Sequence, residues 1–161
     1  MKNSQLEVSF LDPKLLKKLC RSYGAADSAY QSYSAAGLTY FKSDMSEPAF
    51  LEFGGALQIS HVQISNSETR SWRWAARLVE STNKVIVTLN EIQCHDLVAP
   101  LLRKVSNELH AVLKSEDWGH GKEAAKLSDW CTAMYCPERQ KTMASLYRTK
   151  AELIGTPLSH H

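Results

Sequence analysis

Apolar and basic positions separate most clearly between Arg70 and Ile92. At about 100° per residue, a helix through this run places four cations in one narrow stripe: Arg70, Arg73, Arg77 and Lys84. The opposite arc collects aromatic and aliphatic side chains, namely Trp72, Trp74, Ala75, Leu78, Val79, Val85, Ile86 and Leu89. The pattern predicts one long amphipathic helix, with its apolar arc toward a core and its basic stripe toward solvent or a partner.

Helical spacing also marks the N-terminal third of the chain. Asp12 followed by Pro13 is typical of a helix start, and the apolar residues that follow predict a helix over 13–23. Small and aromatic residues at three- or four-residue steps predict a second helix over 25–42. Residues 49–54 fit a short helix, whereas 57–64 alternate only in part, and we expect them to be irregular or a short strand.

The start of the long helix is marked by Ser65 and Glu68, which have the spacing of a capping box. This spacing predicts that the helix begins at residue 67 or 69. Residues 85–89 are also compatible with a strand, but the apolar arc continues through Ile92 and favours a helix.

Three further helices are predicted in the C-terminal half. Asp96 and Pro100 mark the start of a strongly apolar helix that should end near Ser115. A turn at 118–121 leads to a shorter helix through 124–134. A final helix should begin at Pro137 and stop at the Gly155 to Pro157 segment.

Together these elements predict an all-α protein, an irregular bundle of six to seven helices. No repeat or shift in composition divides the chain, so we expect one domain over 1–161, with 1–11 and 156–161 flexible. Hydrophobic residues at 43% and charged residues at 22% are typical of globular proteins and exclude a disordered or low-complexity chain. A formal net charge of +2 is far from that of a dedicated nucleic-acid coat protein.

The sequence also bears on location. No apolar run approaches the roughly 18 to 20 residues that span a bilayer, so we expect no membrane partner. The first ten residues do not resemble a secretory signal, which makes the cytoplasm the expected location. The cysteines are then expected to be reduced thiols, packed as small apolar groups.

The basic stripe is the first candidate for function. Arginines one helical turn apart can each engage a phosphate, and an exposed Trp72 can stack on an unpaired base. We therefore predict a non-enzymatic binding module that engages RNA, DNA or an acidic protein surface through five residues: Arg70, Trp72, Arg73, Arg77 and Lys84. A structural or self-assembling protein, in which the stripe is only a solvated face, is a second interpretation, and a homo-oligomer is compatible with both.

The third interpretation is enzymatic. Six residues separate Arg103 from His110, and this spacing resembles the short motif of the HEPN ribonucleases, small helical bundles that usually dimerise around an RNA-cleaving cleft. The two residues are about 20° apart on a helix. The resemblance implies metal-independent RNA cleavage, with His110 in acid–base catalysis and Arg103 stabilising the charge of the phosphorane.

The sequence gives weaker indications of a metal or cofactor site. Cys94, His95, Cys131 and Cys136, with His120 near them in the sequence, supply ligand types that zinc prefers. Their spacing does not match the compact cysteine pairs of structural zinc sites, so we expect no metal. The chain also lacks the glycine-rich, His-Glu-x-x-His and EF-hand motifs, and we expect no cofactor.

Overall fold

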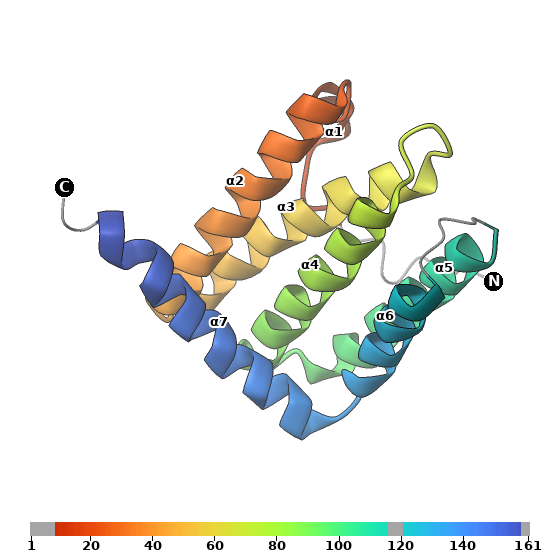
Figure 1. Ribbon diagram of the computed structural model, residues 1–161. Helices are drawn as coiled ribbons and strands as arrows, with labels where there is room; N and C mark the ends of the chain where they lie inside the picture. The colour runs from red at the N-terminus through yellow and green to blue at the C-terminus, as the bar shows by residue number, and fades with distance from the viewer. Residues whose placement is uncertain (1–8, 116–120, 159–161) are drawn as a thin grey trace.

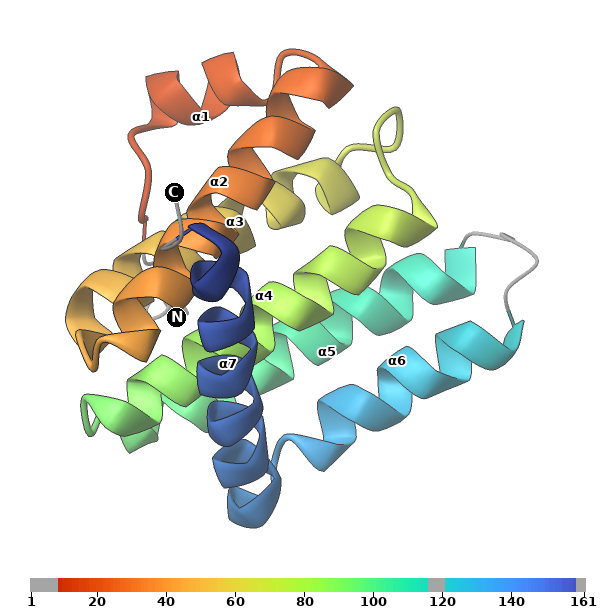
Figure 2. The same cartoon turned by 60° about the vertical axis from the view of Figure 1, so that its left-hand side comes forward.

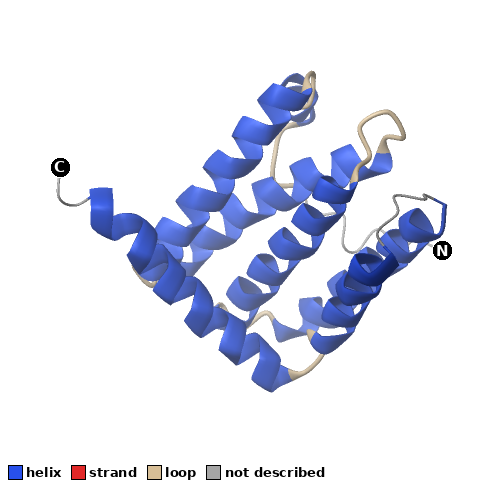
Figure 3. Cartoon of the chain, in the orientation of Figure 1, coloured by secondary structure: helices blue, strands red, loops and turns tan. Residues whose placement is uncertain are grey.

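The computed structural model describes residues 9–115 and 121–158, and this part of the chain is all helical (Figures 1 and 3). In chain order the elements are α1 (Pro13–Leu19), α2 (Tyr23–Lys42), α3 (Ser46–Ser65), α4 (Trp72–Glu91), the short 3-10 helix η2 (His95–Leu97), α5 (Val98–Ser115), α6 (Gly121–Ala133) and α7 (Pro137–Leu158). Seven α-helices without a strand in the described residues confirm the predicted all-α class. None of the described helices has the length and apolar content needed to cross a membrane.

Helix α4 lies at the centre of the bundle. It packs most extensively on α3, and it also contacts α5, α6, α7 and η2. Helix α2 covers the other side of α3, α5 and α6 run side by side, and α7 runs across α2 and α4 (Figures 1 and 2). Because neighbours surround its second half, every residue of α4 from Ser81 to Leu89 is buried.

The predicted apolar arc of α4 does face the core. Trp74, Ala75 and Leu78 are fully buried, and the remaining aliphatic residues of the arc are at most 3% exposed. Helix α5 adds the stripe that its spacing predicted, since Leu102, Val105, Leu109 and Val112 are buried. The expectation of a long amphipathic helix is therefore confirmed. In the second half of α4, however, the polar residues opposite the apolar arc are buried as well.

Close packing of α2 against α3 depends on small residues. A Cβ atom built on Gly37 of α2 would lie 2.4 Å from the ring of Phe53 in α3. Phe53 is fully buried and packs near Phe41, with 6.5 Å between the ring centroids. Glycine is thus needed at residue 37 for the two helices to approach this closely.

One predicted helix start and one predicted helix end differ from the structure. Ser71, and not Ser65, caps the long helix, because its Oγ accepts a hydrogen bond from the N–H of Trp74 at 3.2 Å. Ser65 is the last residue of α3, and the Asn66 side chain accepts from the N–H of Glu68 in a turn. The helix predicted over 13–23 ends at Leu19, because Ser22 caps a new helix there.

The expectation of an irregular or extended segment over 57–64 is wrong, since this segment is the second half of α3. Its periodicity is weak because α2 covers one side of the helix and α4 another, so apolar residues occur on several faces. The final helix also continues through Gly155 and Pro157 to Leu158. The predicted turn residues 118–120 lie outside the described part of the chain.

The start of the described chain is tied to α3. The side-chain carbonyl of Gln58 accepts hydrogen bonds from the N–H groups of Phe10 and Leu11, both at 2.9 Å. Leu11 is buried. Residues 10 and 11 therefore contact α3, and residues 156–158 belong to α7, while the expected flexibility of the two ends stays a prediction.

Candidate functional site

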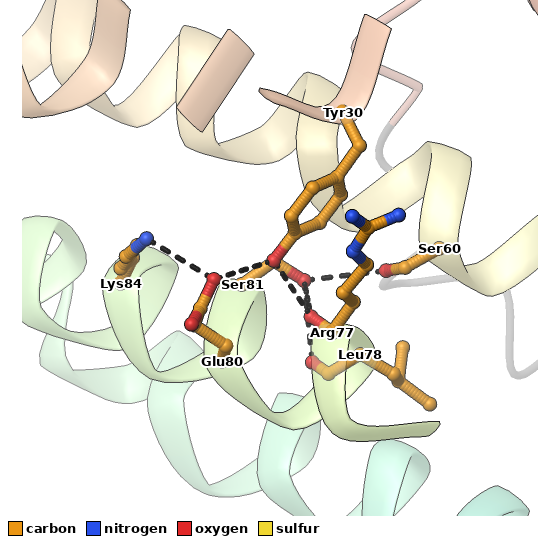
Figure 4. A network of polar contacts seen from close by, with 7 residues as sticks. All are labelled: Tyr30, Ser60, Arg77, Leu78, Glu80, Ser81 and Lys84. Carbon is orange, nitrogen blue, oxygen red and sulfur yellow. Dashed lines mark hydrogen bonds and ion pairs between the residues drawn. The ribbon is translucent and has the colours of Figure 1, made fainter. Parts of the chain in front are cut away.

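Arg77, at the centre of the predicted basic stripe, is held inside the bundle (Figure 4). Its Nη2 atom lies 2.6 Å from Oδ1 of Asp27 in α2, and its side chain is only 14% exposed. The guanidinium carbon is 4.8 Å from the ring centroid of Tyr30 and 4.7 Å from that of Trp74. The ion pair with Asp27 and the cation–π contact with Tyr30 thus join α4 to α2 through this residue, and the contact with Trp74 lies within α4.

Lys84 is buried more deeply, with 3% of its side chain exposed. Its Nζ lies 3.4 Å from Oε1 of Glu80, one turn earlier on α4. The hydroxyl of Tyr30 donates to the same Glu80 oxygen at 2.8 Å, so α2 and α4 share this carboxylate (Figure 4). The ammonium of Lys84 also lies 5.8 Å from the ring centroids of both Phe53 and Tyr147.

The first residues of the stripe lie nearer the surface. The Nε of Arg70 donates to the Ile64 carbonyl at 2.8 Å, which satisfies a carbonyl in the last turn of α3. Arg73 is exposed, and its Nη1 donates to the hydroxyl of Tyr23 at 3.0 Å. Trp72 is half-buried and Trp74 fully buried, so only the first of these indoles reaches the surface.

The basic stripe is therefore not the continuous solvent-facing surface that its spacing predicted. Arg77 and Lys84 turn inward because carboxylates and aromatic rings of the bundle surround them. Helical spacing places residues on one face but does not reveal whether another helix covers that face. Arg73 and, in part, Arg70 and Trp72 are the members of the predicted partner-binding set that remain at the surface.

The residues of the ribonuclease-like motif lie on α5. Arg103 and His110 are both exposed, on the side of the helix opposite its buried stripe. Ser106 between them is half-buried. Both residues thus lie on one side of one helix, as their spacing predicted, and the catalytic roles stay a prediction.

The residues considered as metal ligands are not brought together where they are described. Among residues 9–115 and 121–158, no three His, Cys, Asp or Glu side chains form a group that could hold a metal ion. His95 instead contacts Asn90, with 2.9 Å between Nδ1 and Oδ1. His120 and the side chain of Cys131 lie outside the part of the chain that the structure describes.

A cavity of about 370 Å³ lies between α3, α4 and α5. Its walls are mainly aliphatic, with two phenyl rings from Phe10 and Phe50 that meet edge to face at 5.2 Å between centroids. The aliphatic lining comes from all three helices and η2: Leu57, Val85, Leu89, Leu97, Leu101 and Val105. An apolar cavity of this size, open to the surface, is typical of sites that bind small molecules.

Polar side chains line the same cavity (hereafter the α3–α5 cavity). Nε2 of His61 in α3 lies 2.6 Å from Oε2 of Glu108 in α5, and both side chains are about one-third exposed. Lys104, one turn before Glu108, is exposed and makes no ion pair or hydrogen bond with any described residue. The side-chain carbonyl of Gln58 accepts hydrogen bonds from Phe10 and Leu11, and its NH₂ group donates to none of the described residues.

A second cavity, of about 460 Å³, lies between α4, α5 and α7. The side-chain amides of Asn90 and Gln140 line this cavity and form hydrogen bonds with each other and with the backbone. Nδ2 of Asn90 donates to Oε1 of Gln140 at 2.5 Å, and Nε2 of Gln140 donates to the Met134 carbonyl at 2.6 Å. These two amides are therefore already used within the fold, unlike the NH₂ group of Gln58 in the α3–α5 cavity.

Sequence reasoning did not find the α3–α5 cavity. Gln58 and His61 lie in the segment that the sequence predicts to be irregular or a short strand, and Lys104 and Glu108 lie between Arg103 and His110 but are not among the predicted site residues. The one signal in the sequence is the partial apolar spacing of 57–64, which fits a helix buried on two sides.

Comparison of the chain with protein-family models, with curated proteins and with solved structures found no match.

Proposed function

We propose that this chain is a non-enzymatic helical binding module whose ligand site is the α3–α5 cavity. The observation that carries the proposal is an open cavity of about 370 Å³ with aliphatic walls, bordered by the ammonium of Lys104 and the NH₂ group of Gln58, neither of which has a described partner. Burial of an apolar ligand there is favourable by about 25 cal/mol for each Å² removed from water. The polar groups at the rim orient the ligand.

Titration with N-phenyl-1-naphthylamine, a neutral apolar dye that fluoresces when it leaves water, tests this proposal. We expect saturable binding with one site. Leu101→Trp places a larger side chain in the cavity wall and should abolish dye binding. Leu113→Trp is the matched control, because Leu113 is also half-buried on α5 but does not line the cavity.

Circular dichroism of both variants verifies that each is folded. Dye binding by the control, and not by Leu101→Trp, supports the cavity as the site. If the wild type binds no dye, or if a folded Leu101→Trp protein binds it as tightly as the wild type, the proposal is wrong.

A second candidate retains the predicted anionic partner but moves it to the start of α4. Arg73 is exposed there and bonded to Tyr23, which is itself 49% exposed. Arg21, two residues before Tyr23, and two lysines of α1, Lys17 and Lys18, are also exposed. An exposed aromatic ring beside arginines favours single-stranded nucleic acid as the partner.

Binding of a labelled single-stranded RNA, measured by fluorescence anisotropy at increasing salt, tests the second candidate. Affinity should fall steeply with salt, and Arg73→Ala should weaken binding more than Arg103→Ala, a change at an exposed arginine of α5. Salt-independent binding, or equal effects of the two variants, would contradict it. Preference for a polyglutamate competitor over RNA would favour an acidic protein surface.

The ribonuclease interpretation stays a prediction with its own test. It requires metal-independent cleavage of single-stranded RNA that His110→Ala abolishes while the fold persists. Cytoplasmic location and self-association are likewise predictions, and sedimentation of the full chain measures the second.

A further inference from the structure

The polar side chains at the rim of the α3–α5 cavity are unequally paired. Glu108 turns toward His61, with 2.6 Å between Oε2 and Nε2, and not toward Lys104, although Lys104 lies one turn away on the same helix. A lysine placed before a glutamate is the less favourable order for such a pair. The ammonium of Lys104 is therefore left to water or to a ligand in the described structure.

A second donor lines the same cavity. Both hydrogen bonds that the Gln58 carbonyl accepts, from Phe10 and Leu11, fix the orientation of its amide. The NH₂ group of Gln58 is thereby held as a donor without a described acceptor. An ammonium and an amide N–H match the acceptor oxygens of a carboxylate.

The walls define the rest of the ligand. Six aliphatic side chains outnumber the two phenyl rings, and the described lining has no tyrosine or tryptophan on which an aromatic ligand would stack. A volume of about 370 Å³ is near the small end of the range for ligand cavities, about 300 to 1,000 Å³. The space suits a saturated chain of moderate length better than a long lipid or a nucleotide.

From these observations we infer that the α3–α5 cavity binds an amphipathic monocarboxylate, such as a medium-chain fatty acid. Its chain lies between α3, α4 and α5, and its carboxylate accepts from Lys104 and Gln58. The inference rests on the proposed function and adds to it the chemical class of the ligand. It also assigns Lys104 as the residue that selects a negative head group.

Displacement of bound N-phenyl-1-naphthylamine by decanoate, decanol and decylamine, each below its micelle concentration, tests the inference. In the wild type, decanoate should displace the dye at concentrations at least tenfold lower than decanol, and decylamine should be the weakest. Lys104→Met keeps the aliphatic stem and removes the charge, so it should remove the preference for decanoate while dye affinity stays within twofold. Lys114→Met is the control, because Lys114 is an exposed lysine of α5 that does not line the cavity.

The outcomes separate the two proposals. If the wild type binds no dye, the proposed function fails. If it binds dye but decanoate and decanol displace the dye equally, or if Lys104→Met keeps the preference for decanoate, only the inference about the head group fails. In Lys104→Glu the preference should reverse toward decylamine, and persistence of the decanoate preference in that variant would also overturn the inference.

Discussion

The guanidinium of Arg77 pairs with the carboxylate of Asp27 at 2.6 Å, while the rings of Tyr30 and Trp74 flank it on α2 and α4. Arg77, which the spacing of the sequence predicted to lie on a partner-binding surface, thus joins two helices of the bundle. The same holds for Lys84, whose ammonium lies beside Glu80 in the interior. Two of the four stripe cations therefore contribute to stability rather than to an exposed face.

Arg77→Ala should lower the free energy of unfolding by about 2–4 kcal/mol, because it leaves Asp27 without its ion-pair partner, with only the hydrogen bond from Gln31, and removes packing between two rings. Arg73→Ala, at an exposed position, should change it by less than about 0.5 kcal/mol. Urea denaturation of both variants measures the difference. Equal stability of the two would show that Arg77 is a surface residue in solution.

Substitutions at Lys84 test burial of the ammonium. In Lys84→Met the Glu80 carboxylate keeps its bond to Tyr30 and remains 43% exposed, so stability should change by about 1 kcal/mol or less. Lys84→Glu places a second carboxylate beside Glu80 in the interior and should cost about 4 kcal/mol or more. Thermal unfolding compares them, and a stable Lys84→Glu protein would contradict the interior position.

Stability should fall above pH 10. Burial raises the pKa of Tyr30 and of Tyr147 above the ordinary value of 10.0, and the negative charge of Glu80 raises both further. Below pH 10 both tyrosines are neutral in the folded and unfolded chains, so their ionisation does not yet lower the free energy of unfolding. At higher pH the unfolded chain releases protons that the folded chain retains, and each tyrosine lowers the unfolding free energy by about 1.4 kcal/mol per pH unit.

Tyr147→Phe isolates this effect, because the Tyr147 hydroxyl makes no hydrogen bond with a described residue. At pH 7 the variant should be as stable as the wild type or more so. Between pH 10 and 11 the variant should lose about 1 kcal/mol less stability than the wild type, because the unfolded wild-type Tyr147 is only partly ionised in this range. Urea denaturation at several pH values measures the slope, and an unchanged slope would contradict a buried, neutral Tyr147.

Gly37→Ala tests the close approach of α2 and α3. The new Cβ would lie 2.4 Å from the Phe53 ring, so the variant should lose about 1–3 kcal/mol of stability despite the better helix propensity of alanine. Gly24→Ala is the control in the same helix, because nothing lies within 4 Å of its Cβ, and it should be neutral or stabilising. Equal gains in both variants, measured by thermal unfolding, would contradict the tight packing at Gly37.

Much of the fold follows from one-sided periodicity. Helices α4 and α5 were predictable because each has a distinct apolar arc, and the start of α1 was predictable because Asp12 caps it and Pro13 follows. The second half of α3 was not predictable in this way. It is buried against two helices, so its apolar residues do not form a single stripe.

The site was less predictable than the fold for a related reason. Whether Arg77 and Lys84 face water depends on Asp27, Tyr30 and Tyr147, which come from other helices and are distant in the sequence. The α3–α5 cavity likewise exists only where three helices leave space between them. Spacing along one helix contains no information about either relationship.

Amide chemical-shift mapping by ¹H–¹⁵N NMR, with the full chain titrated with N-phenyl-1-naphthylamine, tests directly whether the space between α3, α4 and α5 is the ligand site. We expect the largest shifts at residues that line this space, such as Leu57, His61, Leu101 and Val105. Shifts that instead cluster at the start of α4 around Arg73, or an unchanged spectrum at saturating dye, would contradict the proposed site.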